Sequence, residues 1–284
     1  MKYDIYIAPV IPMTTSPPLP PNLSWSPISS TLIQTEKSAV LVDTAITVEQ
    51  NTALADWVSL KLSPGVELTH IYITHGHGDH FFGVPLLQNR FPGVKFIATQ
   101  GTLEHVKQQY EPANYDGIWN KFFPGQIAEG KPIPEALPEN GRFEVDGHAF
   151  QAVEVGHTDT FDTTVLHVPE LKLVVGGDVV YGDCYQHFGE AKTPEKRAEW
   201  LRALDKVSEL GAEVAVAGHM KEEQVGRDSA EVLIGNTKKY IQDFEEEKSK
   251  VNNGQDLFMS MKKKYPDRLN DFILMLGSNA AFAV

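Results

Sequence analysis

The segment from Thr74 to His80, with the sequence Thr-His-Gly-His-Gly-Asp-His, constrains this chain more than any other feature. It places three imidazoles and a carboxylate close together, directly after an apolar stretch that we expect to be a buried strand. The two glycines allow the backbone to fold tightly enough for these side chains to converge. Imidazole binds zinc and other first-row divalent ions, and a carboxylate helps to hold a second ion nearby. Three of the chain's ten histidines fall in this segment, which favours a metal site over a polar loop.

Three more ligand-type residues each follow an apolar stretch that runs into glycine. They are His157 after Gly156, Asp178 after Gly177 and His219 after Gly218. One such residue alone is more often structural than a metal ligand. Three in one chain, in addition to the histidine-rich segment, indicate that several strand ends bring their side chains to a common metal site.

The complete pattern, His-x-His-x-Asp-His followed by His, Asp and His, resembles the metallo-β-lactamase superfamily from about Leu32 to His219. The resemblance implies an α/β (α+β) fold, an αββα four-layer sandwich of two mixed β-sheets flanked by helices. It also implies two metal sites. The first ion is expected on His75, His77 and His157. The second is expected on Asp79, His80 and His219, with Asp178 bridging both ions.

The resemblance extends to the segment Val40-Leu41-Val42-Asp43-Thr44, which is similar to an early strand of the family. Asp43 is therefore a candidate for orienting a ligand histidine from outside the metal site. The alternative is an ordinary turn residue.

Two divalent metal ions are thus the expected cofactors, zinc first, with iron or manganese as alternatives. Two ions a few ångströms apart lower the pKa of a shared water to near neutrality and so supply a bridging hydroxide as the nucleophile. We expect this hydroxide to attack an ester-like carbonyl or a phosphorus centre, and Asp79 to pass a proton to the leaving group. The chain is therefore predicted to be a metal-dependent hydrolase.

The fold alone does not choose the substrate, but several residues narrow it. His77 argues against the di-iron flavoproteins of the family, which usually have Glu at that position, and Asp178 argues against true β-lactamases. Tyr181, three residues after Asp178, has the spacing of the lactonases that open acyl-homoserine lactones, where the phenol hydrogen-bonds the substrate carbonyl. The alternative for Tyr181 is a packed aromatic. Lactones and related small esters, thioesters or amides are the expected substrates.

Other readings stay open. A glyoxalase-II-like thioesterase is one, although the run from Asp159 to Asp162 departs from the His-Thr-Pro-Gly of those enzymes and weakens the case for glutathione thioesters. A mononuclear iron persulfide dioxygenase is another, and it would use only three of the seven ligands. The presence of both His80 and His219 favours two metals over one. A catalytically silent metal-binding module is the weakest reading, because no ligand is missing.

Residues 108–140 form a predicted loop insertion rich in aromatic residues and proline, and long connections of this kind usually carry function when they are ordered. Trp119 and Phe122 are candidates for contact with a hydrophobic acyl group. The alternative is that they hold the loop against the body. His187 lies in the loop after Tyr181 and is a further candidate for substrate contact, or else a surface imidazole.

The remaining chain predicts alternating strands and helices in a single domain, residues 1–284. Expected strands span residues 30–34, 39–42, 69–74, 94–98, 149–155, 164–168, 171–176 and 213–217. Helices are expected at 47–62, 102–110 and 194–211, followed by a helical C-terminal extension at about 221–284 that docks on the body or on a second subunit. Seven prolines between residues 9 and 27 predict an extended surface segment there.

The net charge of −13 makes a nucleic-acid partner a poor expectation, and a small-molecule substrate is expected instead. Cys184 is the only cysteine, so a disulfide framework within the chain is excluded and a reducing compartment is favoured. We find neither a signal peptide nor a stretch of 18 apolar residues, and therefore expect a cytoplasmic protein without membrane contact. A homodimer is a further expectation, since dimers are frequent in the family.

Overall fold

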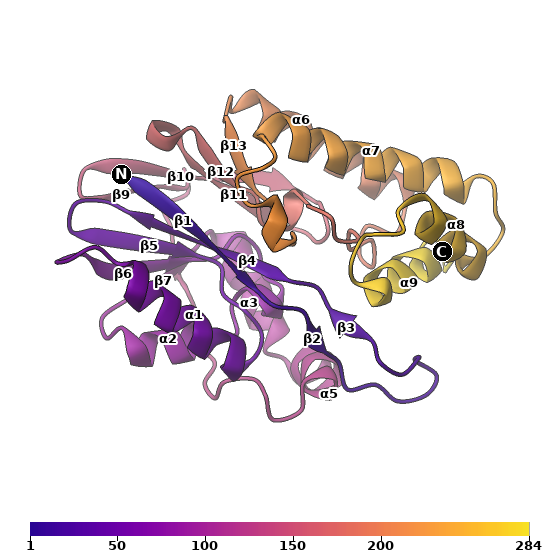
Figure 1. The fold of residues 1–284 in the computed structure, drawn as a ribbon, viewed down its shortest axis with the longest axis horizontal. Helices are drawn as coiled ribbons and strands as arrows, with labels where there is room; N and C mark the ends of the chain where they lie inside the picture. The colour runs from indigo at the N-terminus through magenta and orange to yellow at the C-terminus, as the bar shows by residue number, and fades with distance from the viewer. Residues whose placement is uncertain (284) are drawn as a thin grey trace.

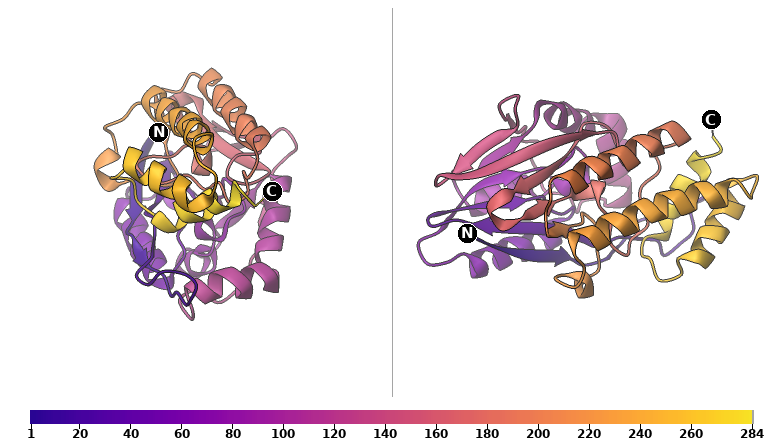
Figure 2. Two further views of the ribbon diagram at one scale, coloured as in Figure 1. Left: turned by 90° about the vertical axis from the view of Figure 1, so that its right-hand side faces the viewer. Right: turned by 90° about the horizontal axis from the view of Figure 1, so that it is seen from above.

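Two mixed β-sheets pack face to face, with helices on both outer sides (Figure 1). This computed structural model describes residues 1–283. The four layers are most easily separated when the molecule is viewed from its end and from above (Figure 2). The αββα sandwich predicted from the ligand motif is therefore confirmed.

The first sheet has the strand order β1-β4-β5-β6-β7-β8. The pairs β1–β4 and β4–β5 are antiparallel, whereas β5, β6, β7 and β8 run parallel to one another. The side chains of β4 are buried along its whole length, as expected for a strand covered on both faces. The bounds are β1 (Lys2–Ala8), β4 (Ile28–Gln34), β5 (Ser38–Val42), β6 (Glu67–Tyr72), β7 (Lys95–Ala98) and β8 (Glu135–Ala136).

The second sheet has the order β13-β12-β11-β10-β9, in which only the pair β12–β13 is parallel. The pairing of β10 with β11 shifts between Glu154 and Gly156, so the end of β10 carries a bulge. The bounds are β9 (Arg142–Val145), β10 (His148–Gly156), β11 (Thr163–Val168), β12 (Leu173–Val175) and β13 (Val214–Val216). A separate two-stranded ribbon joins β2 (Ile11–Pro12) to β3 (Ser24–Trp25).

Helices cover both sheets. The helices α1 (Val48–Lys61) and α2 (Val84–Arg90) lie outside the first sheet, and α6 (Pro194–Glu209) and α7 (Ala230–Lys248) lie outside the second (Figure 1). The helix α3 (Gln100–Gln109) contacts both β8 and β11. Local sequence fixes where two of these helices start: Thr47 forms a capping box with Gln50, and Thr193 caps α6 ahead of Pro194.

The C-terminal helices α8 (Gly254–Lys264) and α9 (Asp271–Ala280) cover one end of the sandwich (Figure 2, left). Of the two docking arrangements expected for this extension, the structure shows docking on the chain's own body, since α9 contacts β3. At the same end, residues 108–140 form three successive short helices, α4 (Pro112–Asn114), η2 (Tyr115–Trp119) and α5 (Asn120–Phe122). Further single turns are η1 (Gly78–His80), η3 (Pro169–Leu171), η4 (Gly177–Val179) and η5 (Glu222–Gln224).

Most expected elements are present, with ends that differ by a few residues, but the sequence did not reveal β1, β9 or α2. The expectation that residues 9–27 form a surface segment is wrong for its last part. Trp25, Ser26 and Pro27 are buried, because the ribbon β2–β3 directs this part of the chain into the end of the sandwich.

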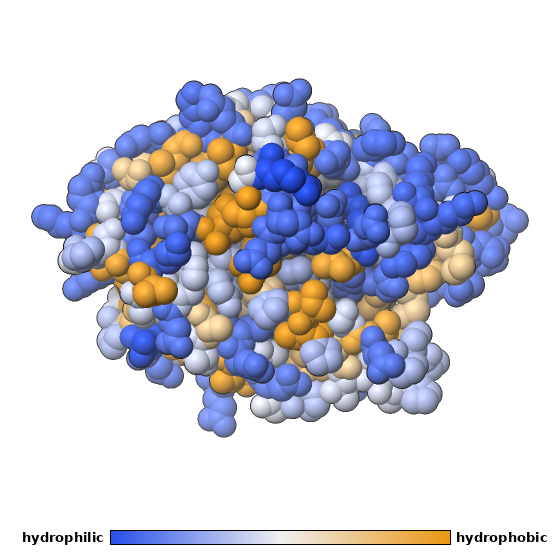
Figure 3. Space-filling view, viewed as in Figure 1, coloured by the Kyte–Doolittle hydropathy of each residue, from blue (hydrophilic) through white to orange (hydrophobic). Residues whose placement is uncertain are grey.

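The outer surface is mainly hydrophilic over α6 and α7, and hydrophobic residues appear on this face as separate patches (Figure 3). The large apolar side chains that stand most exposed, Leu60 and Met259, lie on the different helices α1 and α8. Isolated exposed apolar residues are normal for folded proteins. No helix within residues 1–283 combines the length and the apolar character needed to cross a membrane.

Candidate metal centre

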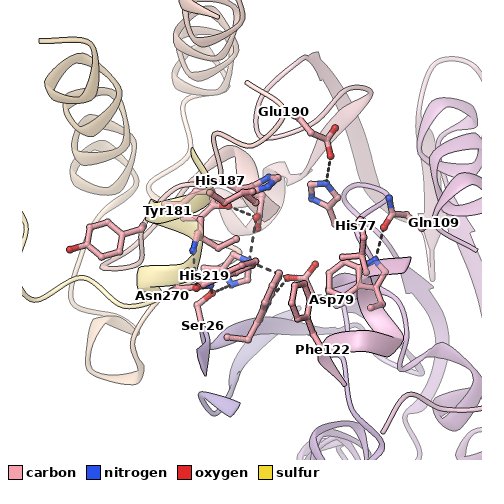
Figure 4. Close-up of a pocket in the computed structure, with 18 of the residues that line it drawn as sticks. Ser26, His77, Asp79, Gln109, Phe122, Tyr181, His187, Glu190, His219 and Asn270 are labelled. Atoms are coloured by element: carbon pink, nitrogen blue, oxygen red, sulfur yellow. Dashed lines mark hydrogen bonds and ion pairs between the residues drawn. The ribbon is translucent and has the colours of Figure 1, made fainter. Parts of the chain in front are cut away.

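Turns that carry metal-ligand side chains follow four strands at the end of the sandwich that α9 covers. Residues 75–80 follow β6, Asp159 follows β10, Asp178 lies in η4 directly after β12, and His219 follows β13. Figure 4 shows His77, Asp79 and His219 converging on one cavity, with Tyr181 and Glu190 beside them. Strand ends hold these turns in place, so ligands that are far apart in the sequence meet in space.

Glycine allows the turns to pack this closely. A Cβ atom at Gly76 would overlap the ring of His105, and one at Gly218 would overlap a carboxylate oxygen of Asp178. The amide of Gly218 also donates to the carbonyl oxygen of Gly177 at 2.8 Å, which ties the turns after β12 and β13 together. Gly76 and Gly218 therefore allow the close packing of the centre.

Side chains from these turns form three overlapping groups with the composition of metal sites. In each group, one potential ligand atom per residue lies within 4.8 Å of the others. The groups are His75, His80 and Asp178; His75, His77 and Asp159; and Asp79, His80 and His219. The shared members His75 and His80 connect them into one centre.

The residues fit two divalent ions, because buried imidazole nitrogens and carboxylate oxygens face one another at short distances. His75 Nε2, His80 Nε2, Asp159 Oδ2 and Asp178 Oδ1 are buried, and their neighbours are ligand-type groups of the same centre: Asp159 Oδ2 lies 2.9 Å from His77 Nδ1, and Asp178 Oδ1 lies 3.2 Å from His80 Nε2. Buried polar atoms are normally satisfied, and a bound ion would satisfy all four. Imidazole and carboxylate together suit zinc, iron or manganese.

The structure does not bring His157 into this centre. Its side chain is half-buried, its Nδ1 lies 2.9 Å from the carbonyl oxygen of Thr158, and it belongs to none of the groups found among the described residues. Asp159 lies there instead, with Oδ2 2.9 Å from His77 Nδ1 and 3.6 Å from His75 Nε2. The bulge at the end of β10 and the positive φ of Gly156 redirect the chain just before these residues.

Asp43 lies behind the centre, where its carboxylate holds a ligand histidine. Its Oδ2 is 3.1 Å from His80 Nδ1 and accepts from the Thr74 hydroxyl at 2.8 Å, while Oδ1 accepts from the Thr74 amide at 2.9 Å. The side chain is buried. These contacts leave His80 Nε2 as the nitrogen that faces the centre, the arrangement in which a carboxylate orients a metal-binding imidazole.

Other ligand-type histidines are oriented in the same way. His219 Nδ1 is 3.0 Å from Ser26 Oγ and 2.8 Å from the carbonyl oxygen of Pro27, so its Nε2 faces the carboxylates of the centre. His77 Nε2 is 3.1 Å from Glu190 Oε1, and the other Glu190 oxygen accepts from Thr160 Oγ1 at 2.6 Å. One nitrogen of each ring is thus held and the other is directed inward.

The electrostatics of the centre are those of closely paired opposite charges. Burial disfavours the charged imidazolium, yet Asp159 and Glu190 hold the pKa of His77 well above its ordinary value. Burial disfavours the charged carboxylate too, yet His219 and His80 hold the pKa of Asp178 well below its usual range. The carboxylates therefore stay ionised and attract either protons or metal cations to the imidazoles.

A cavity of about 300 Å³ opens over the centre (Figure 4). Its floor is polar and its walls are largely apolar. The polar floor consists of His77, Asp79, Asp178, Glu190 and His219. The apolar wall comes from β3, from residues 108–140 and from α9, and consists of Trp25, Ile118, Trp119, Phe122, Phe272, Ile273 and Leu276.

The sequence-predicted substrate residues all line this cavity. Trp119 and Phe122 stand in the wall, and Trp119 Nε1 donates to Gln109 Oε1 at 2.7 Å. The Tyr181 hydroxyl donates to Asp178 Oδ2. His187 packs edge-on against His77, with 5.3 Å between the ring centroids, and burial lowers the pKa of His187.

Several residues of the site were not predicted from the sequence. Asp159 could have been considered as a ligand, since it lies two positions after His157 in a run that departs from the glyoxalase pattern. Glu190 has no motif around it. Trp25 lies in the proline-rich segment and Phe272 in the C-terminal helices, and only the tertiary fold shows that both reach the cavity.

Comparison with solved structures shows the same fold in other proteins. A metallo-beta-lactamase family protein from Thermus thermophilus has a TM-score of 0.61 and 19% identity, covering 96% of this chain and 91% of that one. A metallo-beta-lactamase from Pontibacter korlensis has a TM-score of 0.57 and 19% identity over 84% of this chain and 99% of that one. The mono-zinc form of a Pseudomonas aeruginosa metallo-beta-lactamase has a TM-score of 0.54 and 17% identity, over 77% and 84%.

Sequence similarity to a curated relative is local, whereas the match to a family is extensive. A hydroxyacylglutathione hydrolase from Stenotrophomonas maltophilia (strain R551-3) is 43% identical over 67 residues, and the match spans 24% of this chain and 23% of that enzyme. The family model described as the Metallo-beta-lactamase superfamily matches residues 23–219, more than half of the chain and all of the turns that build the centre. The chain therefore belongs to the metallo-beta-lactamase superfamily.

Proposed function

We propose that this chain is a metal-dependent hydrolase that opens a lactone or cleaves a related small ester, thioester or amide with a hydrophobic acyl part. The observation that carries the proposal is the cavity of about 300 Å³, which joins the histidine–aspartate centre to an apolar wall. Catalytic and binding sites of small-molecule enzymes have this composition, a few convergent polar groups within a mainly apolar pocket.

Two divalent ions, zinc first, supply a hydroxide nucleophile near neutral pH and polarise the substrate carbonyl when they are bound. His75 and His77 would hold one ion, and Asp79, His80 and His219 the other. Asp178 lies between the two sets, with Oδ1 3.2 Å from His80 Nε2 and Oδ2 3.3 Å from His219 Nε2. The mono-zinc form of the structurally similar Pseudomonas aeruginosa protein supports zinc as the first metal to test.

Asp79 and Tyr181 are the side chains that would act on the substrate. The Asp79 carboxylate faces the cavity, with Oδ2 held by a 2.9 Å hydrogen bond from Trp25 Nε1, and could take up the proton that the nucleophile releases and pass it to the leaving group. Burial and the neighbouring Asp178 hold the pKa of Tyr181 well above its ordinary value. The phenol therefore stays protonated and serves as a hydrogen-bond donor, first to Asp178 and then to a substrate carbonyl.

The walls of the cavity favour a neutral, apolar acyl group. Among the described residues that line it, none is Lys or Arg, whereas Asp79, Asp178 and Glu190 are acidic. A substrate carboxylate that lies away from the metal ions would find no Lys or Arg in the described lining with which to pair. An apolar chain would instead bury its surface against Trp119, Phe122 and the apolar side of α9.

A thioester is the second candidate, because the local match to a hydroxyacylglutathione hydrolase favours it. Thioesters and lactones present the same electrophilic carbonyl to a metal-activated hydroxide. The absence of a basic residue from the described lining favours thioesters of small neutral thiols over those of glutathione, which carries two carboxylates.

Metal analysis of the purified protein, combined with a hydrolysis panel, tests the proposal. The panel contains lactones, simple esters and thioesters with acyl chains of increasing length. We expect about two zinc ions per chain, and hydrolysis that is lost on chelation and in His80→Ala. About one iron per chain, no hydrolysis and oxygen uptake with a persulfide would overturn the proposal in favour of an oxygenase.

A further inference from the structure

We propose that Asp159, rather than His157, completes the first metal site, so that two imidazoles and one carboxylate hold this ion. The family pattern assigns a third imidazole to that position. The inference rests on the proposed function, because it assumes that metal ions bind. It concerns only which side chains bind them, so metal binding can test it without a measurement of enzyme activity.

The carboxylate of Asp159 has the setting of a metal ligand. It is fully buried, and Oδ1 accepts a hydrogen bond from the Thr158 hydroxyl at 2.9 Å. Oδ2 lies 2.9 Å from His77 Nδ1, an ion-pair contact when that imidazole is protonated, and 3.6 Å from His75 Nε2. One oxygen is thus held in place while the other points, with two imidazole nitrogens, at a common position.

The energetics of burial support the same assignment. Removing an ionised carboxylate from water is strongly unfavourable unless it is paired with a cation or binds a metal. A structural aspartate in the core would normally satisfy both oxygens with hydrogen bonds. Oδ2 of Asp159 faces His77 Nδ1 and His75 Nε2, so the cation that compensates this carboxylate is either a proton on an imidazole or a metal ion held by all three side chains.

The local backbone keeps His157 away from this position. Gly156 has a φ of +94°, directly after the bulge in β10, and its carbonyl oxygen accepts from the Thr163 hydroxyl at 2.7 Å. The Thr158 amide donates to the carbonyl oxygen of Thr160 at 2.8 Å, which closes the turn. The same turn that buries Asp159 leaves His157 half-buried and outside the centre.

The substitution of a carboxylate for an imidazole changes the metal preference that we expect. Oxygen donors suit manganese and iron(II) better than imidazole does, whereas three imidazoles favour zinc. The first site should therefore discriminate less strongly between zinc and manganese than a three-histidine site would.

The test compares two matched variants, Asp159→Asn and His157→Asn, by the amount of metal bound per chain. Each protein is stripped of metal and dialysed against zinc or manganese, and the bound ion is measured by elemental analysis. In Asp159→Asn we expect one of the two ions to bind at least about 10-fold more weakly, whereas His157→Asn should bind both ions as the unchanged protein does. Circular dichroism of the metal-free proteins shows whether each variant is folded.

Weak binding in His157→Asn, with or without a loss in Asp159→Asn, would overturn the assignment, and so would full binding in Asp159→Asn. If Asp159→Asn fails to fold, the result for His157→Asn still decides the matter. A protein that binds two ions in this pattern but hydrolyses nothing in the panel would refute the proposed function and leave the ligand assignment intact.

Discussion

At each end of the sandwich, an imidazole lies between carboxylates that come from different sheets. At the end with the cavity, His80 lies 3.1 Å from Asp43 and 3.2 Å from Asp178, and all three side chains are buried. At the opposite end, His148 Nδ1 lies 2.7 Å from Glu170 and Nε2 lies 3.0 Å from Glu36, and these two carboxylates are 55% and 63% exposed.

The comparison shows what separates a metal centre from a surface ion pair. Both nitrogens of His148 already have carboxylate partners, and water solvates those partners. Both nitrogens of His80 likewise face carboxylates, Asp43 at Nδ1 and Asp178 at Nε2, but these partners are buried and are not solvated by bulk water. Burial of the imidazoles and their carboxylate partners, rather than the pairing itself, therefore distinguishes the candidate metal centre from the surface ion pair.

The largest difference between the two ends should appear when metal is removed. Chelation removes the cations that the buried carboxylates and imidazoles of the centre need, so we expect hydrolysis to stop. The melting temperature should fall by roughly 5–10 °C, because an ion that binds only the folded state stabilises it. Scanning calorimetry with and without the chelator checks this, and re-addition of zinc should restore both properties. An unchanged melting temperature would contradict a metal centre at this end.

A smaller effect should follow from Asp43→Asn, because the amide no longer carries the charge that orients His80. We expect metal affinity to fall by about 10–100-fold. The matched control is Asp146→Asn at the opposite end. Asp146 also has a positive φ and accepts hydrogen bonds from Thr35 and Ser38, but it is far from the centre. Competition with a chromogenic chelator measures both affinities, and equal losses in the two variants would contradict a specific role for Asp43.

The cavity end was largely predictable from the sequence because its ligands follow strands at regular positions. An apolar stretch, a glycine and a ligand residue recur before Asp178 and His219, and the histidine-rich segment follows β6 directly. The inward position of Asp159 in place of His157 was not predictable, since it depends on the bulge at the end of β10 and on the turn that follows it. The two residues are two positions apart and would share one face of a regular strand, so the backbone of the turn, rather than the sequence spacing, decides which of them points inward.

The apolar wall was predictable only in part, for a different physical reason. Residues 108–140 stood out as rich in aromatics, but Trp25 and α9 reach the cavity through tertiary packing between distant parts of the chain. Trp25 lies 5.4 Å from Trp119 and 6.2 Å from Phe272, measured between ring centroids. Contacts of this kind depend on how the C-terminal helices dock, which no local pattern encodes.

Mutation of the apolar wall should change substrate preference and leave the metal content of the centre unchanged. Phe122→Ala removes a ring that packs edge-on against Phe272 at 5.2 Å. We expect kcat/KM for substrates with long acyl chains to fall by about 10-fold through lost apolar contact, with short-chain substrates and bound metal unaffected. Met259→Ala, on the exposed side of α8, is the control. Equal losses for short and long chains would show that Phe122 supports the fold rather than the substrate.

The smallest effect should be a pH-dependent change in melting temperature when His148, at the opposite end, is replaced. Hydrogen bonds with Glu170 and Glu36 raise the pKa of His148 above its ordinary value of 6.5. A raised folded-state pKa means that the pairing stabilises the fold fully below pH 6.5 and stops doing so as the pH rises through the folded-state value. His148→Gln should therefore lower the melting temperature by about 1 °C at pH 6 and by nothing measurable at pH 9.

Because the partners are exposed, 0.5 M salt should remove most of the difference at pH 6. A loss that persists at pH 9 or in salt would show that His148 acts through packing, and that the two ends of the sandwich differ less than their burial implies.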